Sequence, residues 1–178
     1  MTTPLADIIV WVDEAMSLAK FPFAFGGALA LAYHVEEPRA TRDIDINVFV
    51  PAVNAREVLK ALDRVAYTPS DVERLERDGQ VRVFYEDTPL DLFLVNHPFH
   101  DQVAANVEKV PFLDRMIPIL SATDLAVFKA FFNRTKDWAD LEAMADARTF
   151  DVHVVIGWVV DLLGADDPRV DRLRLLLG

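Results

Sequence analysis

Residues 42–47, Arg42-Asp43-Ile44-Asp45-Ile46-Asn47, contain the pattern on which the predicted fold and function depend. Successive side chains of a β-strand point to opposite faces, so Asp43, Asp45 and Asn47 share one face and the two isoleucines the other. The strand rise separates the Cα atoms of the two aspartates by roughly 7 Å, which lets one divalent cation bind both carboxylates. Two carboxylates this close repel each other unless a cation lies between them. Because residues 48–50 are apolar, the pattern predicts a metal site. A solvated acidic pair at the edge of a strand is the alternative.

The length and composition indicate one globular domain with a helical appendage. The chain has 178 residues, 52% of them hydrophobic, which is enough to bury a core. It contains no cysteine, which excludes disulfides and thiolate metal sites and fits a reducing cytoplasm. Residues 1–4 lack the basic start and apolar run of a signal peptide. The apolar stretch 152–163 is too short to span a bilayer, and we expect it to be a buried helix. We therefore expect a cytoplasmic protein without a membrane partner.

The charge distribution restricts the expected nucleic-acid contacts. The net charge of −11 argues against a broad, non-specific nucleic-acid surface, because phosphate groups would be repelled. A local basic patch stays open, made of Arg39, Arg42, Lys129, Arg134 and Lys136.

The periodicity predicts an α+β fold, in which a small mixed β-sheet flanked by helices precedes a helical C-terminal region. Helices are expected at 5–19, 28–34 and 54–66, and extended segments at 21–25, 43–50, 80–86, 90–95 and within 110–120. Residues 87–89 are the predicted hairpin turn, and Ser121 is the predicted cap of a helical region that runs to the end of the chain. The result is a core at residues 1–120 and a helical region at 121–178 that completes the active site.

Two features of the core could carry chemistry beside the aspartate pair. Gly26-Gly27 lies between a short strand and a helix, where glycine lets backbone amides approach a phosphate. A purely conformational role in the turn is the alternative. Asp91 lies in an apolar strand on the face opposite to its leucines, and an acid there needs a partner or a metal. An acid that caps the hairpin turn or faces solvent is the alternative. If this strand lies beside that of Asp43, three carboxylates converge.

The C-terminal region contributes a lysine and two acids. Lys129 is the only cation among residues 124–132, so it either extends outward to solvent or contacts an anionic ligand. Asp137 and Asp140 lie about one turn apart on the same side of the next predicted helix, and a solvated charged face is the alternative. His97 and His100 have no further zinc-type ligands near them in the sequence, so no zinc site is expected.

Taken in order, Gly26-Gly27-Ala28, then residues 41–46 (Thr-Arg-Asp-Ile-Asp-Ile), then Asp91 resemble the motifs of the DNA polymerase β-like nucleotidyltransferase superfamily. A Leu-x-x-x-Lys segment at 125–129 and a Lys-Asp-x-x-Asp-Leu segment at 136–141 resemble its AbiEii-type branch, which includes abortive-infection and MenT-like toxins. The resemblance spans about residues 23–145. Many family members have Gly-Ser where this chain has Gly27-Ala28, so one hydroxyl that would bind a phosphate is missing.

The resemblance implies a nucleotidyltransferase that uses a nucleoside triphosphate and Mg²⁺, with two ions as cofactors. The expected metal ligands are Asp43, Asp45 and Asp91, and the expected catalytic residues are these three with Lys129 and Asp140. The expected nucleotide-binding residues are Gly26, Gly27, Arg42, Lys129 and Asp137. In this scheme Asp91 completes the ion on the acceptor side, and Lys129 and Arg42 neutralise the pyrophosphate.

The sequence leaves three alternatives open for the acceptor or the role of the protein. By the resemblance, the first is RNA, at the 3′ end of tRNA, modified by the toxin of a toxin–antitoxin pair with a cognate antitoxin as partner. The second is a small molecule such as an aminoglycoside-like hydroxyl, or a protein side chain, because an acidic surface suits a cationic acceptor. The third is a catalytically inactive nucleotide-binding module.

Overall fold

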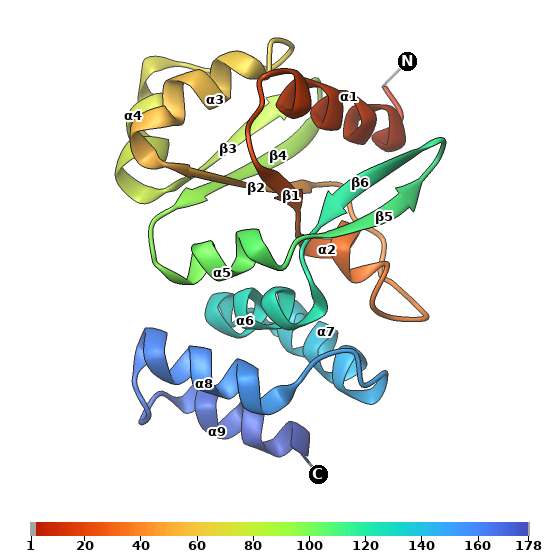
Figure 1. The fold of residues 1–178 in the computed structure, drawn as a ribbon, viewed down its shortest axis with the longest axis vertical. Coiled ribbons are helices and arrows are strands. Elements are labelled where there is room, and N and C mark those ends of the chain that lie inside the picture. The colour runs from red at the N-terminus through yellow and green to blue at the C-terminus, as the bar shows by residue number, and fades with distance from the viewer. Residues whose placement is uncertain (1–2, 178) are drawn as a thin grey trace.

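The computed structural model describes residues 3–177, in which a six-stranded mixed sheet is covered by helices (Figure 1). The strand order is β3-β4-β2-β1-β6-β5. The strands are β1 Phe23–Phe25, β2 Ile44–Pro51, β3 Gln80–Tyr85, β4 Thr88–Val95, β5 Glu108–Phe112 and β6 Arg115–Ile119. β2 runs parallel to β4 and antiparallel to β1, and β1 runs parallel to β6. This confirms the predicted fold class.

The helices lie in layers on the two sides of the sheet. They are α1 Leu5–Leu18, α2 Gly27–Leu31, α3 Ala55–Ala61, α4 Pro69–Asp78, α5 Phe99–Ala105, α6 Ala122–Phe132, α7 Thr135–Asp146, α8 Val152–Leu163 and α9 Pro168–Arg174. In Figure 1, α1, α3 and α4 lie above the sheet, α5 and α6 below it, and α8 and α9 form the outermost layer. None of the helices in the described part of the chain is long and apolar enough to cross a membrane.

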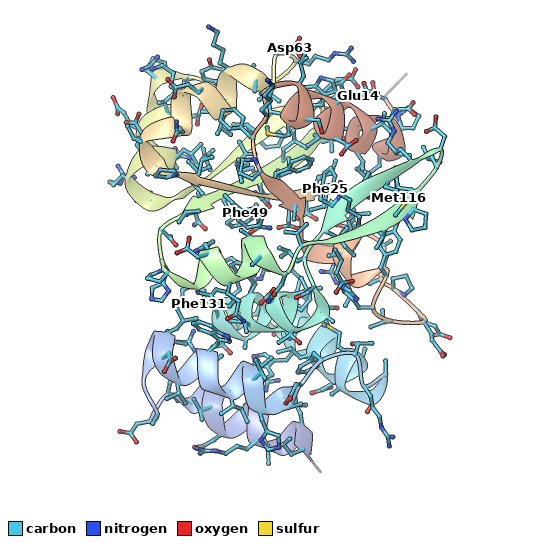
Figure 2. The ribbon with its side chains drawn as sticks, in the orientation of Figure 1. Glu14, Phe25, Phe49, Asp63, Met116 and Phe131 are labelled. Carbon is cyan, nitrogen blue, oxygen red and sulfur yellow. The ribbon has the colours of Figure 1, made fainter. Side chains whose placement is uncertain are left out.

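The alternation in β2 and β4 separates the core from the site, as predicted. Ile44, Ile46 and Val48 of β2 and the leucines at 90, 92 and 94 of β4 are at most 1% exposed. They belong to one buried cluster with side chains of α1 and with Phe25, which Figure 2 labels near the centre of the molecule. Burying each such side chain stabilises the fold by about 1.5–3 kcal/mol. The opposite face of the two strands is thereby free to carry polar groups.

Several predicted boundaries are wrong. The helix expected at 54–66 ends at Ala61, because Leu62 leaves the helical region with φ −85° and ψ 69°. The strand expected from residue 43 begins at Ile44, so Asp43 lies just before it. The helix α4 was not predicted, although its signals are present in the sequence: Thr68 and Asp71 form a capping box, and Gly79 ends the helix in the left-handed region. The short helix α5 was also missed.

The hairpin turn and the C-terminal helices also differ from expectation. β3 pairs with β4 up to Tyr85 and Thr88, so the turn consists of Glu86 and Asp87 rather than residues 87–89. Glu86 has a φ of 50°, as this tight turn requires. The region after Ser121 is helical as predicted, and the Ser121 hydroxyl accepts a hydrogen bond from the amide of Asp124. The segment 152–163, expected to be a buried helix, is a surface helix, in which Val155 and Val159 are the fully buried residues.

Candidate active site

The pairing of β2 with β4 places two of the predicted acids side by side. The strands are parallel, and Asp45 lies directly opposite Asp91. Both side chains point away from the isoleucine and leucine core, because they occupy the alternate positions of their strands. Asp43, one residue before β2, is also partly buried at this end of the strand. The structure therefore brings the three predicted acids together near the start of β2, on the face of the sheet opposite to the isoleucine and leucine core.

The glycine pair lies directly against Asp45. The Gly26 amide donates a hydrogen bond to the Asp45 carbonyl at 2.9 Å. Gly27 has a φ of 52°, and a Cβ atom added there would collide with the Asp45 carboxylate. A Cβ at Gly26 would lie 2.7 Å from the Asn47 side-chain nitrogen. The conformational reason for the two glycines is therefore real, and they also keep the approach to Asp45 free of side chains.

The two aspartates of the motif differ in their electrostatic surroundings. Burial, followed by the charges of Asp43 and Asp91, raises the pKa of Asp45 from its ordinary 3.8 to about 6. Among residues 3–177 no side chain or amide donates a hydrogen bond to the Asp45 carboxylate. Burial alone would also raise the pKa of Asp43, but the Thr41 hydroxyl and the Lys136 charge outweigh it, and the pKa is lowered. Within the described part of the chain Asp45 therefore has no ion-pair partner, although the charges of Arg134 and Lys129 partly offset the rise of its pKa.

Asp91 is held by an arginine that the sequence did not point to. The Nε and Nη2 atoms of Arg82 donate to its two oxygens at 2.7 and 2.6 Å. Arg82 is the cross-strand neighbour of Asp91 in β3, and its Nη2 also lies 3.6 Å from an Asp43 oxygen. Within the described residues, no three acids or histidines are arranged closely enough to hold a metal ion. The three carboxylates do lie close together in the fold, but one of them, Asp91, forms an ion pair with Arg82.

Lys129 is buried, not extended to solvent. It is 3% exposed, and its Nζ donates to Asp140 at 2.6 Å. Arg39 donates to both oxygens of the same carboxylate at 3.1 and 3.2 Å. Burial lowers the pKa of Lys129, while Asp140 opposes that effect. Lys129 and Asp140, both expected as site residues, therefore form one ion-pair network with Arg39, and this network also connects α6 to α7.

A cleft collects most of the predicted residues. Its polar lining consists of Gly27, Asp43, Asp45, Asn47, Arg39, Lys129, Arg134, Lys136 and Asp137. Asp91 lines an adjoining cleft that shares Asp45 and Arg134 with the first. Asp140 lies behind Lys129, and Arg42 is exposed and lines neither cleft. Four of the five cations of the predicted basic patch thus gather around the aspartates, despite the net charge of the chain.

Two further groups belong to the site. Arg134 donates to both oxygens of Asp137 at 2.7 and 3.1 Å and lies over the ring of Phe132. Phe93 of β4 and Phe132 of α6, with ring centres 5.7 Å apart, form a wall common to the two clefts. The position of Phe93, two residues after Asp91, was the available signal for this wall. The histidines are elsewhere: His34 and His100 are buried and bond to backbone carbonyls.

Solved nucleotidyltransferases share the fold of this chain. The antibiotic-resistance factor ANT(2'')-Ia, solved with adenylyl-2''-tobramycin, matches with a TM-score of 0.62 at 13% identity, over 99% of this chain and 100% of that one. The lincosamide antibiotic adenylyltransferase LnuA, bound to lincomycin, matches with a TM-score of 0.54 at 15% identity, over 82% and 98%. An antigenic nucleotidyltransferase-like protein from Paracoccidioides brasiliensis matches with a TM-score of 0.53 at 11% identity, over 97% and 86%.

The sequence itself gives the family. Residues 14–175 match the family described as "Nucleotidyl transferase AbiEii toxin, Type IV TA system". The chain therefore belongs to the AbiEii nucleotidyltransferase family, and it is a nucleotidyltransferase. No curated protein matches the sequence significantly. The family predicted from the motifs is confirmed.

Proposed function

We propose that this protein transfers a nucleoside monophosphate from a nucleoside triphosphate to an acceptor hydroxyl, as an Mg²⁺-dependent toxin that modifies RNA. The observation that carries the proposal is the cleft in which the unpartnered Asp45 carboxylate, the bare Gly27 turn and the buried Lys129 meet. Such a cleft presents a cation-seeking group and a phosphate-seeking group to the same ligand.

The aspartate pair fits a divalent cation. Asp45 has a raised pKa and no donor among the described residues, so a cation bound to it and Asp43 would remove the repulsion that raises this pKa. Bound Mg²⁺ supplies Lewis-acid polarisation of the α-phosphate and stabilises the oxygens on which charge develops. Asp43 and Asp45 would hold that cation, and the Thr41 hydroxyl bonds the Asp43 carboxylate and keeps it in place.

The remaining lining residues suit the triphosphate. Gly26 and Gly27 would let phosphate oxygens approach the backbone amides of the turn, without the serine hydroxyl that many family members have. Lys129, Arg134 and Lys136 line the cleft and would balance the charge of the leaving pyrophosphate. Asp140 holds Lys129 from behind and would keep its ammonium ionised in spite of burial. The role expected for Arg42 stays a prediction, since Arg42 lies outside the cleft.

RNA is the proposed acceptor, with the 3′ end of tRNA as the first choice, on the basis of family membership. Arg134 and Lys136 are exposed at the cleft, and Arg74 and Arg82 line the adjoining one. These cations would bind the phosphates that flank a terminal nucleotide. In the same proposal a cognate antitoxin is a partner of this protein, and the cell compartment is the cytoplasm. Residues 1–120 form the core and residues 121–178 the helical region that completes the active site.

A cationic small molecule is the second candidate acceptor. The net charge of −11 favours encounter with a positively charged ligand. Two of the proteins with the same fold act on or bind antibiotics, as adenylyl-2''-tobramycin and lincomycin indicate. A protein side chain is the other acceptor in this class.

Incubation with each of the four labelled nucleoside triphosphates, Mg²⁺ and total tRNA tests the proposal. Label is expected on RNA in the wild type, and its loss is expected with Asp45→Asn or with a metal chelator. Asp161→Asn, on the exposed side of α8, is the matched control and should label RNA normally. Label on an aminoglycoside or on protein, with tRNA unlabelled, would favour the second candidate. Nucleotide binding without any transfer would reject both enzymes in favour of an inactive module.

A further inference from the structure

Arg82 forms an ion pair with Asp91, the acid that a second metal ion would need as a ligand. Its two nitrogens bond both oxygens of Asp91, so the carboxylate presents no oxygen that is free of a donor. A third contact reaches Asp43, whose nearest oxygen lies 3.6 Å from Nη2. The guanidinium thus lies between two of the three carboxylates, where a cation bridging them would lie. Because Arg82 is always charged, a metal ion at the same place would be repelled.

The backbone makes this arrangement a permanent feature of the fold. Arg82 and Asp91 are directly opposed in the β3–β4 ladder, which is continuous from Gln80 to Tyr85 and closed by a two-residue turn. Directly opposed side chains of an antiparallel pair point to the same face, with their Cβ atoms about 5 Å apart. The bidentate geometry is therefore set by the register of the hairpin. It does not depend on a flexible loop.

The charges of the cluster are consistent with a single divalent cation. Asp43, Asp45 and Asp91 carry three negative charges when ionised, and Arg82 returns one positive charge. The remaining charge of minus two matches one divalent ion at the unpartnered Asp45 and the neighbouring Asp43. Without Arg82 the cluster would carry minus three and would favour a second ion.

We infer that Arg82 is a built-in cation at the acceptor side of the site, so that the protein binds one divalent ion at Asp43 and Asp45 and none at Asp91. Arg82 is then a positioning residue: it fixes the Asp91 carboxylate in the β3–β4 ladder and takes the place that a second ion would have. The inference rests on the proposed metal-dependent function and revises the two-ion cofactor expected from the sequence.

Counting bound Mn²⁺ tests this directly. The free ion is measured by electron paramagnetic resonance in the presence of a non-hydrolysable nucleoside triphosphate, with a blank that contains nucleotide alone. The wild type is expected to bind one Mn²⁺ per chain beyond the blank. Arg82→Gln is expected to bind two, because the freed Asp91 becomes a ligand. The double variant Arg82→Gln with Asp91→Asn is expected to return to one. Arg174→Gln removes an exposed arginine of another ion pair on α9 and should leave the count at one.

The outcomes separate the two claims. Two ions in the wild type, or one ion in Arg82→Gln, overturns the role of Arg82 while leaving metal-dependent transfer intact. A second ion that survives in the double variant also overturns it, because the added ion would then not depend on Asp91 as a ligand. No bound Mn²⁺ in any variant overturns the proposed function and the inference with it. Circular dichroism of each variant establishes that it is folded before the count is taken.

Discussion

Replacement of Asp45 by asparagine is expected to stabilise the metal-free protein while it abolishes transfer. The raised pKa of about 6 means that the folded chain holds the Asp45 proton more tightly than the unfolded chain. As the pH rises through the window from 3.8 to about 6, the wild type therefore loses stability. At 1.36 kcal/mol per pH unit, the difference corresponds to about 3 kcal/mol above the window. This value is a ceiling, since Asp45 is only partly buried and solvent screens its charge.

Urea denaturation at two pH values measures the effect. At about pH 8, Asp45→Asn should unfold with a free energy up to about 3 kcal/mol above that of the wild type, and at about pH 4 most of the difference should vanish. Asp43→Asn is the informative comparison, because its lowered pKa predicts a loss of stability at the higher pH. Asp161→Asn, on the exposed side of α8, should change little at either pH.

Two results would refute this reasoning. One is an Asp45→Asn variant that is less stable than the wild type at about pH 8. The other is a gain in stability that stays constant from about pH 8 to about pH 4, because the electrostatic cause requires it to follow the titration of Asp45. Excess Mg²⁺ should also reduce the difference in unfolding free energy between Asp45→Asn and the wild type. Binding of the ion stabilises the folded wild type by mass action, and the variant lacks the carboxylate that binds it.

The other predictions concern the turn and the buried lysine. Gly27→Ala should cost about 2 kcal/mol or more and abolish nucleotide binding, because alanine is strained at a φ of 52° and its Cβ meets Asp45. Gly157→Ala, a control in the interior of α8 with open space around it, should instead stabilise the protein by about 1 kcal/mol. Thermal denaturation and nucleotide titration measure both, and equal effects of the two substitutions would contradict the argument. Lys129→Met should cost about 3 kcal/mol in urea denaturation, the lower end for a broken buried pair, because Arg39 still neutralises Asp140. A neutral effect would mean that Asp140 does not need the lysine and that Arg39 alone is a sufficient partner.

The parts of the site that depend on strand periodicity could be predicted from the sequence. Alternation alone was enough to place Asp45 and Asp91 on the face opposite to Ile44, Ile46 and the leucines, and the structure confirms both faces. The requirement for glycine at Gly27 was also predictable in kind. Its physical reason, the approach of the Asp45 carboxylate, requires contact between segments that are distant along the chain.

The parts that depend on register and on packing between helices could not be predicted. A turn at 87–89 would have paired Arg82 with a residue other than Asp91, whereas the two-residue turn at Glu86 and Asp87 opposes them. The partner of Lys129 was open for a similar reason. Eleven residues separate it from Asp140, and only the angle between α6 and α7 decides whether they meet. Arg39 comes from a loop with no regular periodicity, so no pattern could connect it to this pair.

The loss of stability caused by Asp45 and the conformation of the glycine turn have the same origin, because both keep the Asp45 carboxylate accessible. Asp45 is destabilised because it is buried next to other acids and accepts no hydrogen bond from the described residues. Any side chain at position 27 would collide with its carboxylate, so the glycine turn allows the Asp45 oxygens to stay where they are. The fold retains an acid at a position where asparagine is expected to be more stable, and a backbone conformation that only glycine adopts without strain keeps that acid accessible. If Asp45→Asn gains stability and loses bound Mn²⁺ in the same experiment, the two observations together will attribute that instability to the function of the site.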